Sequence, residues 1–236
     1  MGDFKYSGSE LELFSGAVNW KSYWAHEIEP YLGTRILDVG AGIGSTARVL
    51  CNGSRERWLA LEPDVHLATR MSACADAGDF DCNFEIRVGT VFDLLDDEHF
   101  DTILYIDVLE HIADHRQELS CAARHLAVGG RIVVLSPAHQ WLYTPFDQAI
   151  GHARRYNRQT LLAAKPHHLM VDRIDYLDSV GLLASLGNRL VLRSATPSAA
   201  QIRLWDDWMV PASRVLDRIA RFSLGKSILG VFRSPD

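Results

Sequence analysis

The chain has 236 residues, of which 47% are hydrophobic and 23% are charged, and its formal net charge is −6 at pH 7. Length and composition predict one globular domain, residues 1–236, with a sizeable core. The acidic balance excludes a general attraction to nucleic acid, although a local basic patch stays compatible with it.

Compartment is predicted from what the sequence lacks. No stretch approaches the roughly 20 apolar residues that a membrane span needs, and the N-terminus has no apolar signal-peptide core. The four cysteines show no C-x-x-C spacing, so reduced thiols fit better than a disulfide framework or a zinc site. We therefore expect a cytoplasmic protein, with a peripheral membrane contact left open.

Residues 1–33 are predicted to be helical, because Phe14, Val18, Tyr23 and Trp24 form a rough helical stripe. Such a stripe is typical of a helix that covers a sheet edge.

The most informative stretch follows, at residues 36–44, which read I-L-D-V-G-A-G-I-G. An apolar run ends at three glycines, and a helix-like stretch begins at once. Glycine allows positive φ and lets a ligand lie against bare backbone, and the helix start offers free N–H groups. Asp38 lies inside the predicted strand end, and Glu62 ends the next apolar run, where an acidic residue binds ribose hydroxyls in nucleotide sites.

The remaining chain alternates predicted strands and helices, which favours a parallel doubly wound sheet with its ligand beyond the carboxyl ends of the strands. Residues 34–136 form the core of this sheet, 137–166 a long connection rich in His, Arg and aromatic residues, and 178–226 a helical insertion. Long connections in compact domains are often functional. Strands are predicted at 58–61, 83–88, 100–107, 131–135, 168–177 and 227–232, and helices at 65–77 and 114–126.

These motifs resemble those of class I S-adenosylmethionine (SAM) dependent methyltransferases, over about residues 36–177 and the last strand. The resemblance implies a seven-stranded Rossmann-like α/β fold with an antiparallel last strand and with N-terminal helices as a lid. It implies that Asp38 holds the amino-acid end of SAM and that Glu62 takes the ribose diol. The implied cofactor-binding residues are Asp38, Gly40, Ala41, Gly42, Gly44, Glu62, Pro63, Gly89, Thr90, Val91 and Ile106.

One position departs from that family. The turn at residues 89–91 is expected to line the adenine, but Thr90 stands where the family often has an aspartate, and Asp93 is expected to lie too far along to replace it. Backbone groups of the turn are the expected substitute.

Methyl transfer requires a nucleophile held close to the methyl group and, for a hydroxyl or an ammonium, removal of a proton. A histidine suits the second task. We predict His111, His152 and Asp107 as catalytic residues, with His111 or His152 as base or orienting group. The predicted substrate residues are His139, Tyr143, Arg154, Arg155 and Tyr156.

The arginines belong to residues 146–156, F-D-Q-A-I-G-H-A-R-R-Y, which resemble a bacterial branch of the family whose substrates are largely unassigned. Arg154 and Arg155 suit a clamp for a carboxylate or phosphate. The alternative is a solvated helix start, capped near Asn157 or Thr160, with the arginines paired to Asp147 or other acids.

A metal site is a second alternative. Asp107, Glu110 and His111 give a D-x-x-E-H spacing, to which His139 or His152 would add a fourth ligand. It is similar to the E-x-x-E-H of small-RNA 3′-end 2′-O-methyltransferases. Because E-H at this turn also occurs in methyltransferases without a metal, the sequence favours a metal-independent enzyme.

The sequence therefore predicts a SAM-dependent methyltransferase, with S-adenosylhomocysteine (SAH) as product, that methylates oxygen or nitrogen of a small molecule. No nucleic-acid partner is expected, and the chain is a monomer or a homodimer. The rivals are a metal-assisted O-methyltransferase and a non-catalytic SAM-fold binding protein, while Asp38 and the G-x-G-x-G spacing count against a dehydrogenase. The insertion, with its tryptophans and arginines, is predicted to pack on the core rather than to face a lipid or a partner subunit.

Overall fold

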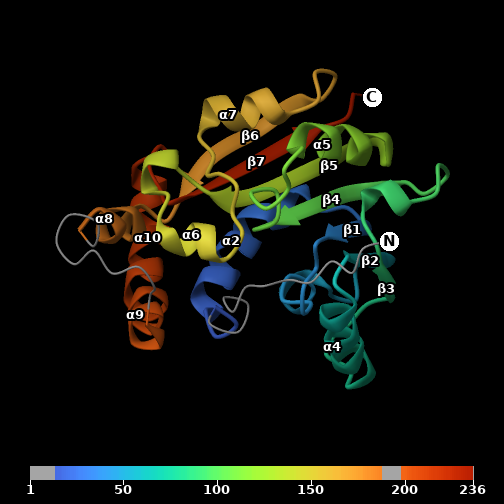
Figure 1. Cartoon of the computed structure of the whole chain (residues 1–236), viewed down its shortest axis with the longest axis horizontal. Coiled ribbons are helices and arrows are strands. Elements are labelled where there is room, and N and C mark those ends of the chain that lie inside the picture. The colour runs from blue at the N-terminus through green and yellow to red at the C-terminus, as the bar shows by residue number, and fades with distance from the viewer. Residues whose placement is uncertain (1–13, 188–197, 236) are drawn as a thin grey trace.

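Seven strands form one mixed sheet in the computed structural model, which describes residues 14–187 and 198–235 (Figure 1). The strand order is β3-β2-β1-β4-β5-β7-β6. Neighbours among the first five strands pair in parallel, and β7 is antiparallel to both β5 and β6. The predicted doubly wound fold and its antiparallel last strand are therefore confirmed. The strands are β1 Arg35–Val39, β2 Arg57–Glu62, β3 Phe84–Val88, β4 Phe100–Ile106, β5 Leu126–Pro137, β6 Met170–Leu177 and β7 Ser227–Arg233.

Helices cover both faces of the sheet, because alternate residues of each buried strand enter different cores. Leu37 enters the core under α5 and α7, whereas Ile36 enters the core shared with α2, α3 and the insertion. Figure 1 shows α8, α9 and α10 together on the side of the molecule opposite β3. The helices are α2 Val18–Ile28, η1 Glu29–Tyr31, α3 Ala47–Leu50, α4 Val65–Asp76, η2 Val91–Asp93, α5 His115–Arg124, η3 Gln140–Leu142, α6 Pro145–Ala149, α7 Arg158–Ala164, α8 Ser179–Gly187, α9 Ala199–Leu204, the π-helical η5 Trp205–Met209 and α10 Val210–Ile219.

The N-terminal helix α2 depends on the insertion for its cap. Ala17 precedes α2 and provides no side-chain cap. Asp206 of η5 instead accepts hydrogen bonds from the backbone N–H groups of Asn19 (3.0 Å) and Trp20 (2.8 Å). Its carboxylate thereby satisfies donors that a helix start leaves open. The helical content predicted for residues 1–13 lies outside the described residues.

The tryptophans of the insertion divide between core and surface. Trp205 is buried, and its ring centroid lies 5.7 Å from that of Trp20, so the predicted packing on the core is confirmed there. Trp208 is 74% exposed, and Ile219 on α10 is 73% exposed. The peripheral membrane contact that the sequence left open is not tested by these positions. Across the described parts of the chain, no helix combines the length and apolarity needed to cross a bilayer.

The prediction of reduced thiols is wrong for two of the four cysteines. Cys51 and Cys82 form a disulfide, whereas Cys74 and Cys121 are free. Cys51 ends α3 and Cys82 precedes β3, and the fold brings their Cα atoms to 5.7 Å, although 31 positions separate them in sequence. Spacing along the chain could not show this pairing because it arises from packing beside β2.

The cap from η5 predicts that Asp206→Ala destabilises the protein by about 1–2 kcal/mol, since two helix N–H groups and a buried carboxylate position lose their partners. Urea unfolding followed by circular dichroism measures the change. Asp207→Ala is the matched control, because Asp207 is the exposed neighbour on the same turn. Equal losses in both variants would contradict a capping role for Asp206.

Candidate active site

The glycine loop after β1 adopts the conformation that its sequence predicts. Gly40, Gly42 and Gly44 have φ values of 64°, 60° and 78°, a region that favours glycine. Glu62 at the end of β2 accepts hydrogen bonds from the backbone N–H groups of Gly42 and Asp64, each at 2.8 Å. The carboxylate therefore joins the glycine loop to the turn after β2. The carboxyl ends of the parallel strands β1 to β4 and the turns that follow them also carry the predicted residues Ala41, Pro63, Gly89, Thr90, Val91 and Ile106.

Asp38, near the end of β1, carries a buried carboxyl group with one oxygen unpaired in the described part of the chain. Asp38 is 1% exposed, and its Oδ2 has no hydrogen-bond partner among the described residues. Burial raises the pKa of Asp38 to about 8, although the side chain of Trp58 acts in the opposite direction, and the nearby charge of Glu62 adds to the rise. A buried carboxylate without a partner is unfavourable, so a cationic ligand group at Oδ2 would stabilise this position.

The turn after β3 contains a contact that sequence reasoning missed. Asp93 reaches back, and its Oδ2 accepts hydrogen bonds from Thr90 N (2.8 Å) and Thr90 Oγ1 (3.0 Å). Asp93 therefore lies against the turn, contrary to the expected separation. The signal was the capping-box spacing of Thr90 and Asp93 at the start of η2. Whether residues 89–91 line an adenine stays a prediction.

Next to the glycine loop, residues of α2 and α3 line an open pocket of about 420 Å³. Lys21 from α2 and Ser45 and Arg48 from the loop–helix junction line it. Burial lowers the pKa of Lys21, and Arg48 adds to this effect. The helix α2 thus lies beside the loop over which it is predicted to act as a lid.

A second group of polar residues gathers after β4. Glu110 is fully buried, and its Oε2 accepts a hydrogen bond from Ser136 Oγ at 2.9 Å, while Oε1 has no hydrogen-bond partner among the described residues. His111 and His152 lie against it, with ring centroids 4.6 Å apart. One ligand atom from each of Glu110, His111 and His152 lies within 4.8 Å of the other two. Two of the three predicted catalytic residues therefore meet here although 41 positions separate them.

The orientation of His152 depends on Asp147, which the sequence suggested only as an ion-pair partner. His152 Nδ1 lies 3.0 Å from Asp147 Oδ1, and Nε2 lies 3.8 Å from Glu110 Oε1. Arg155 holds the same carboxylate with Nε (2.8 Å) and Nη2 (2.9 Å), and Thr144 caps it. Although burial opposes ionisation, hydrogen bonds from His152 and Arg155 hold the pKa of Asp147 well below its usual range.

Burial shifts the pKa values of His111, Glu110 and the neighbouring Asp107. Burial, aided by the neighbouring His152, lowers the pKa of His111 to about 4, so its ring is neutral at physiological pH. Burial and the charge of Asp107 raise the pKa of Glu110 well above its usual range. Asp107, the third predicted catalytic residue, is accessible to solvent, yet desolvation by the surrounding protein raises its pKa to about 6.

The predicted substrate clamp is not supported by the geometry of its arginines. Arg154 donates to the backbone carbonyls of Ile112 and Ala113, and Arg155 forms its bidentate pair with Asp147. Tyr156 is fully buried, which is at odds with direct substrate contact. Arg154 and Tyr156 fasten the 137–166 connection to the loop after β4, whereas Arg155 forms its pair within the connection itself. The alternative pairing with Asp147 is confirmed for Arg155, as is the cap by Asn157 on α7.

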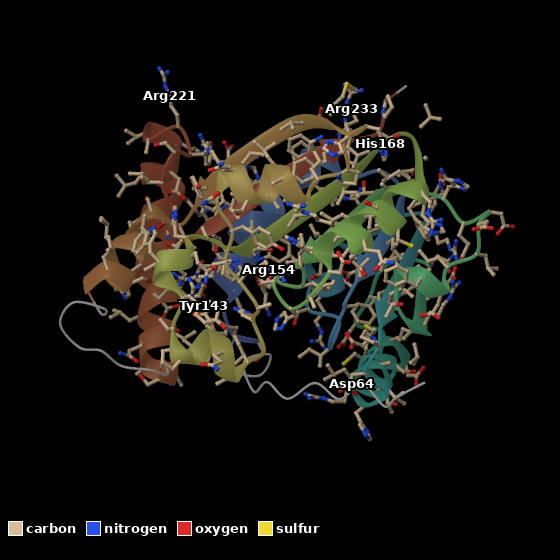
Figure 2. The ribbon with its side chains drawn as sticks, turned by 45° about the horizontal axis from the view of Figure 1, so that its top comes forward. Asp64, Tyr143, Arg154, His168, Arg221 and Arg233 are labelled. Carbon is tan, nitrogen blue, oxygen red and sulfur yellow. A yellow bond between two sulfur atoms is a disulfide. The ribbon has the colours of Figure 1, made fainter. Side chains whose placement is uncertain are left out.

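The other two predicted substrate residues also have partners within the protein. His139 Nε2 lies 3.0 Å from the carbonyl oxygen of Gly225, and its ring stacks on that of Tyr176. His139 is therefore not part of the group formed by Glu110, His111 and His152. Tyr143 donates from its hydroxyl to the carbonyl oxygen of His152 at 2.6 Å (Tyr143 and Arg154 are labelled in Figure 2).

The buried carboxyl group predicts that Asp38→Asn makes the ligand-free protein more stable at alkaline pH. Because the pKa of Asp38 rises from 3.8 to about 8 on folding, the folded state binds more protons between these values, and stability falls as pH rises through this window. Calorimetric melting should therefore show the smallest difference between variant and wild type near pH 4 and the largest above pH 8. A difference that is independent of pH would contradict this explanation.

Comparisons with known proteins agree with this geometry. Residues 37–134 match the family model for a methyltransferase domain. A curated relative, a probable chloroplastic tocopherol O-methyltransferase from Oryza sativa subsp. japonica, is 32% identical over 108 residues. That match covers 44% of this chain and only 29% of the relative, so the chain spans less than a third of the relative's length.

Two solved structures extend the likeness over the whole fold. A SAM-dependent methyltransferase from Archaeoglobus fulgidus is 17% identical, with a TM-score of 0.63 and coverage of 95% of this chain and 98% of the other. The N-methyltransferase NodS from Bradyrhizobium japonicum, in complex with SAH, is 12% identical, with a TM-score of 0.59 and coverage of 98% and 94%. The chain thus carries a methyltransferase domain match at residues 37–134 within the Rossmann-like fold of SAM-dependent methyltransferases.

Proposed function

We propose that this protein is a SAM-dependent methyltransferase that acts on oxygen or nitrogen of a small-molecule acceptor. The observation that carries the proposal is the unpartnered, buried Oδ2 of Asp38 beside a glycine loop whose backbone is already held by Glu62. The methyltransferase domain match over residues 37–134 supports it independently.

The residues at this edge fit SAM in their chemistry. Asp38 would receive the ammonium group at the amino-acid end of the cofactor, which supplies the missing cation. Glu62 retains acceptor capacity for ribose hydroxyls, since each carboxylate oxygen carries more than one lone pair. The turn at residues 89–91, closed by Asp93, would lie against the adenine. When bound, SAM supplies an activated methyl group on a sulfonium.

The histidine pair would serve the acceptor end of the site. His111 and His152 project from the loop after β4 and from the 137–166 connection, both of which follow strands at the carboxyl edge. With its pKa at about 4, His111 is a weak base, so an orienting hydrogen bond suits it better than storage of a proton. Arg154 and Arg155 act as positioning residues, because they hold the connection that carries His152.

The named relatives support this acceptor class. The relative from Oryza sativa subsp. japonica is named as a probable tocopherol O-methyltransferase, and NodS is named as an N-methyltransferase. A second candidate, a SAM-fold protein that binds without turnover, shares the cofactor edge and differs in making no methylated product.

The cofactor assignment predicts that Asp38→Ala weakens SAH binding by about 10- to 150-fold, since a hydrogen bond to a charged group contributes about 1.5–3 kcal/mol. Glu62→Ala should also weaken binding, because the glycine loop loses its anchor. Isothermal titration calorimetry on chelator-treated protein measures both. Glu56→Ala is the matched control, as Glu56 is an exposed acid that precedes β2. No SAH binding to the wild type would refute the proposed function.

Binding should also tighten with pH. Because SAH requires the ionised form of Asp38, whose pKa is about 8 in the ligand-free protein, affinity should rise by up to about tenfold per pH unit between pH 6 and 8. Turnover is then tested by SAH release with phenols, catechols and primary amines as acceptors. SAH binding without product from any of them would favour the non-catalytic candidate.

A further inference from the structure

We propose that Glu110, His111 and His152 form a binding site for a divalent transition-metal ion such as Zn²⁺. This site is additional to the SAM edge and uses a set of residues that differs from the D-x-x-E-H spacing. Asp107, at the first position of that spacing, is not in the group, and His152 is the one of the two further histidines, His139 and His152, that joins it. One buried carboxylate and two imidazoles are a ligand set found in catalytic zinc sites.

The distances are close to those of a coordination sphere. The three candidate ligand atoms all lie within 4.8 Å of one another, and His152 Nε2 lies 3.8 Å from Glu110 Oε1. Tetrahedral Zn²⁺ with bonds of about 2.0–2.1 Å places neighbouring ligand atoms roughly 3.3 Å apart. That pair would have to close by about half an ångström, and each of the other two pairs, which lie within 4.8 Å, by at most about 1.5 Å.

The free oxygen of Glu110 points to a ligand by a separate observation. Glu110 is fully buried. Ser136 donates a hydrogen bond to its Oε2, but Oε1 has no hydrogen-bond partner among the described residues. Buried carboxylates are normally paired or bound to a metal. A cation beside Oε1 would provide the missing partner, and it would lie between the carboxylate and both imidazoles.

The surroundings orient His152 as they do in established metal sites. Metal-bound histidines commonly donate their second ring N–H to a carboxylate, which fixes the tautomer. Asp147 lies 3.0 Å from Nδ1 of His152 and is itself held by Arg155 and Thr144. With Nδ1–H donated to Asp147, the lone pair of Nε2 faces Glu110. Gly151 hydrogen-bonds the ring of His111 through its backbone.

A bound ion would also define the acceptor, a step that rests on the proposed function. Three protein ligands leave coordination positions open, and an acceptor hydroxyl in one of them becomes more acidic. In the transfer, the hydroxyl oxygen forms the bond to the methyl carbon, the sulfonium sulfur keeps the electrons of the bond that breaks, and the hydroxyl proton passes to solvent. This favours phenolic or catecholic acceptors over amines.

The test measures metal binding directly on the full chain. Protein stripped with chelator is titrated with Co²⁺ and with Zn²⁺, and the visible absorption of Co²⁺ reports its coordination. We expect one equivalent to bind, with tetrahedral or five-coordinate intensity. His152→Ala and Glu110→Gln should weaken binding at least 100-fold, and Asp147→Asn should weaken it about 10- to 100-fold. His99→Ala is the matched control, since His99 is exposed at the opposite end of β4.

Absence of an equivalent of bound Co²⁺ in the wild type, or binding that survives both His152→Ala and Glu110→Gln, would overturn the site. Circular dichroism and SAH titration of each variant separate lost metal binding from misfolding. SAH binding without metal binding would refute this inference alone, whereas metal binding without SAH binding would refute the proposed function alone.

Discussion

The arrangement of the carboxyl edge of the sheet depends on two buried carboxyl groups near the ends of neighbouring strands. Asp38 is the penultimate residue of β1, Glu110 follows β4, and β1 and β4 pair directly in the sheet. Each has one oxygen without a hydrogen-bond partner among the described residues. Such groups are costly in a folded protein unless a cation or donor arrives. In the functions that we propose, the free oxygen of Asp38 would receive the ammonium group of the cofactor and the free oxygen of Glu110 a metal ion.

Much of the surrounding structure holds these groups in place. Glu62 fixes the glycine loop beside Asp38, and Asp147 fixes His152 beside Glu110. Both anchors are carboxylates that accept backbone or side-chain hydrogen bonds, so neither depends on ligand. The site is therefore built before ligand arrives, which lowers the cost of binding.

The insertion is fastened by a second buried network. Asp178 accepts hydrogen bonds from Trp205 Nε1 and Ser213 Oγ, each at 2.7 Å. Asp217 accepts from Tyr23 Oη at 2.7 Å and from the backbone N–H of Asp178 at 2.6 Å. These bonds join the end of β6, α10 and α2. The cap of α2, beside the glycine loop, thus depends on a segment late in the chain.

Local signals explain what the sequence could predict. The strands were recognisable because buried parallel strands are nearly continuous apolar runs, and the loop at Gly40, Gly42 and Gly44 because only glycine adopts positive φ so readily. The pairing of Cys51 with Cys82 was not predictable, and the sequence left open whether His139 or His152 lies beside Glu110. Both contacts depend on how distant segments pack, and spacing along the chain carries no information about that. The arginines were misjudged for a related reason: Arg155 has the chemistry of an anion clamp, but the fold provides its anion in Asp147.

The measurement that tests the account most directly is a crystal structure of the protein with SAH and Co²⁺, with anomalous scattering to locate the metal. We predict that the SAH ammonium lies at Asp38 Oδ2, its ribose at Glu62, and its sulfur opposite the loop after β4. We also predict an anomalous peak between Glu110, His111 and His152. SAH bound away from Asp38, for instance in the pocket lined by Lys21 and Arg48, would contradict the central assignment.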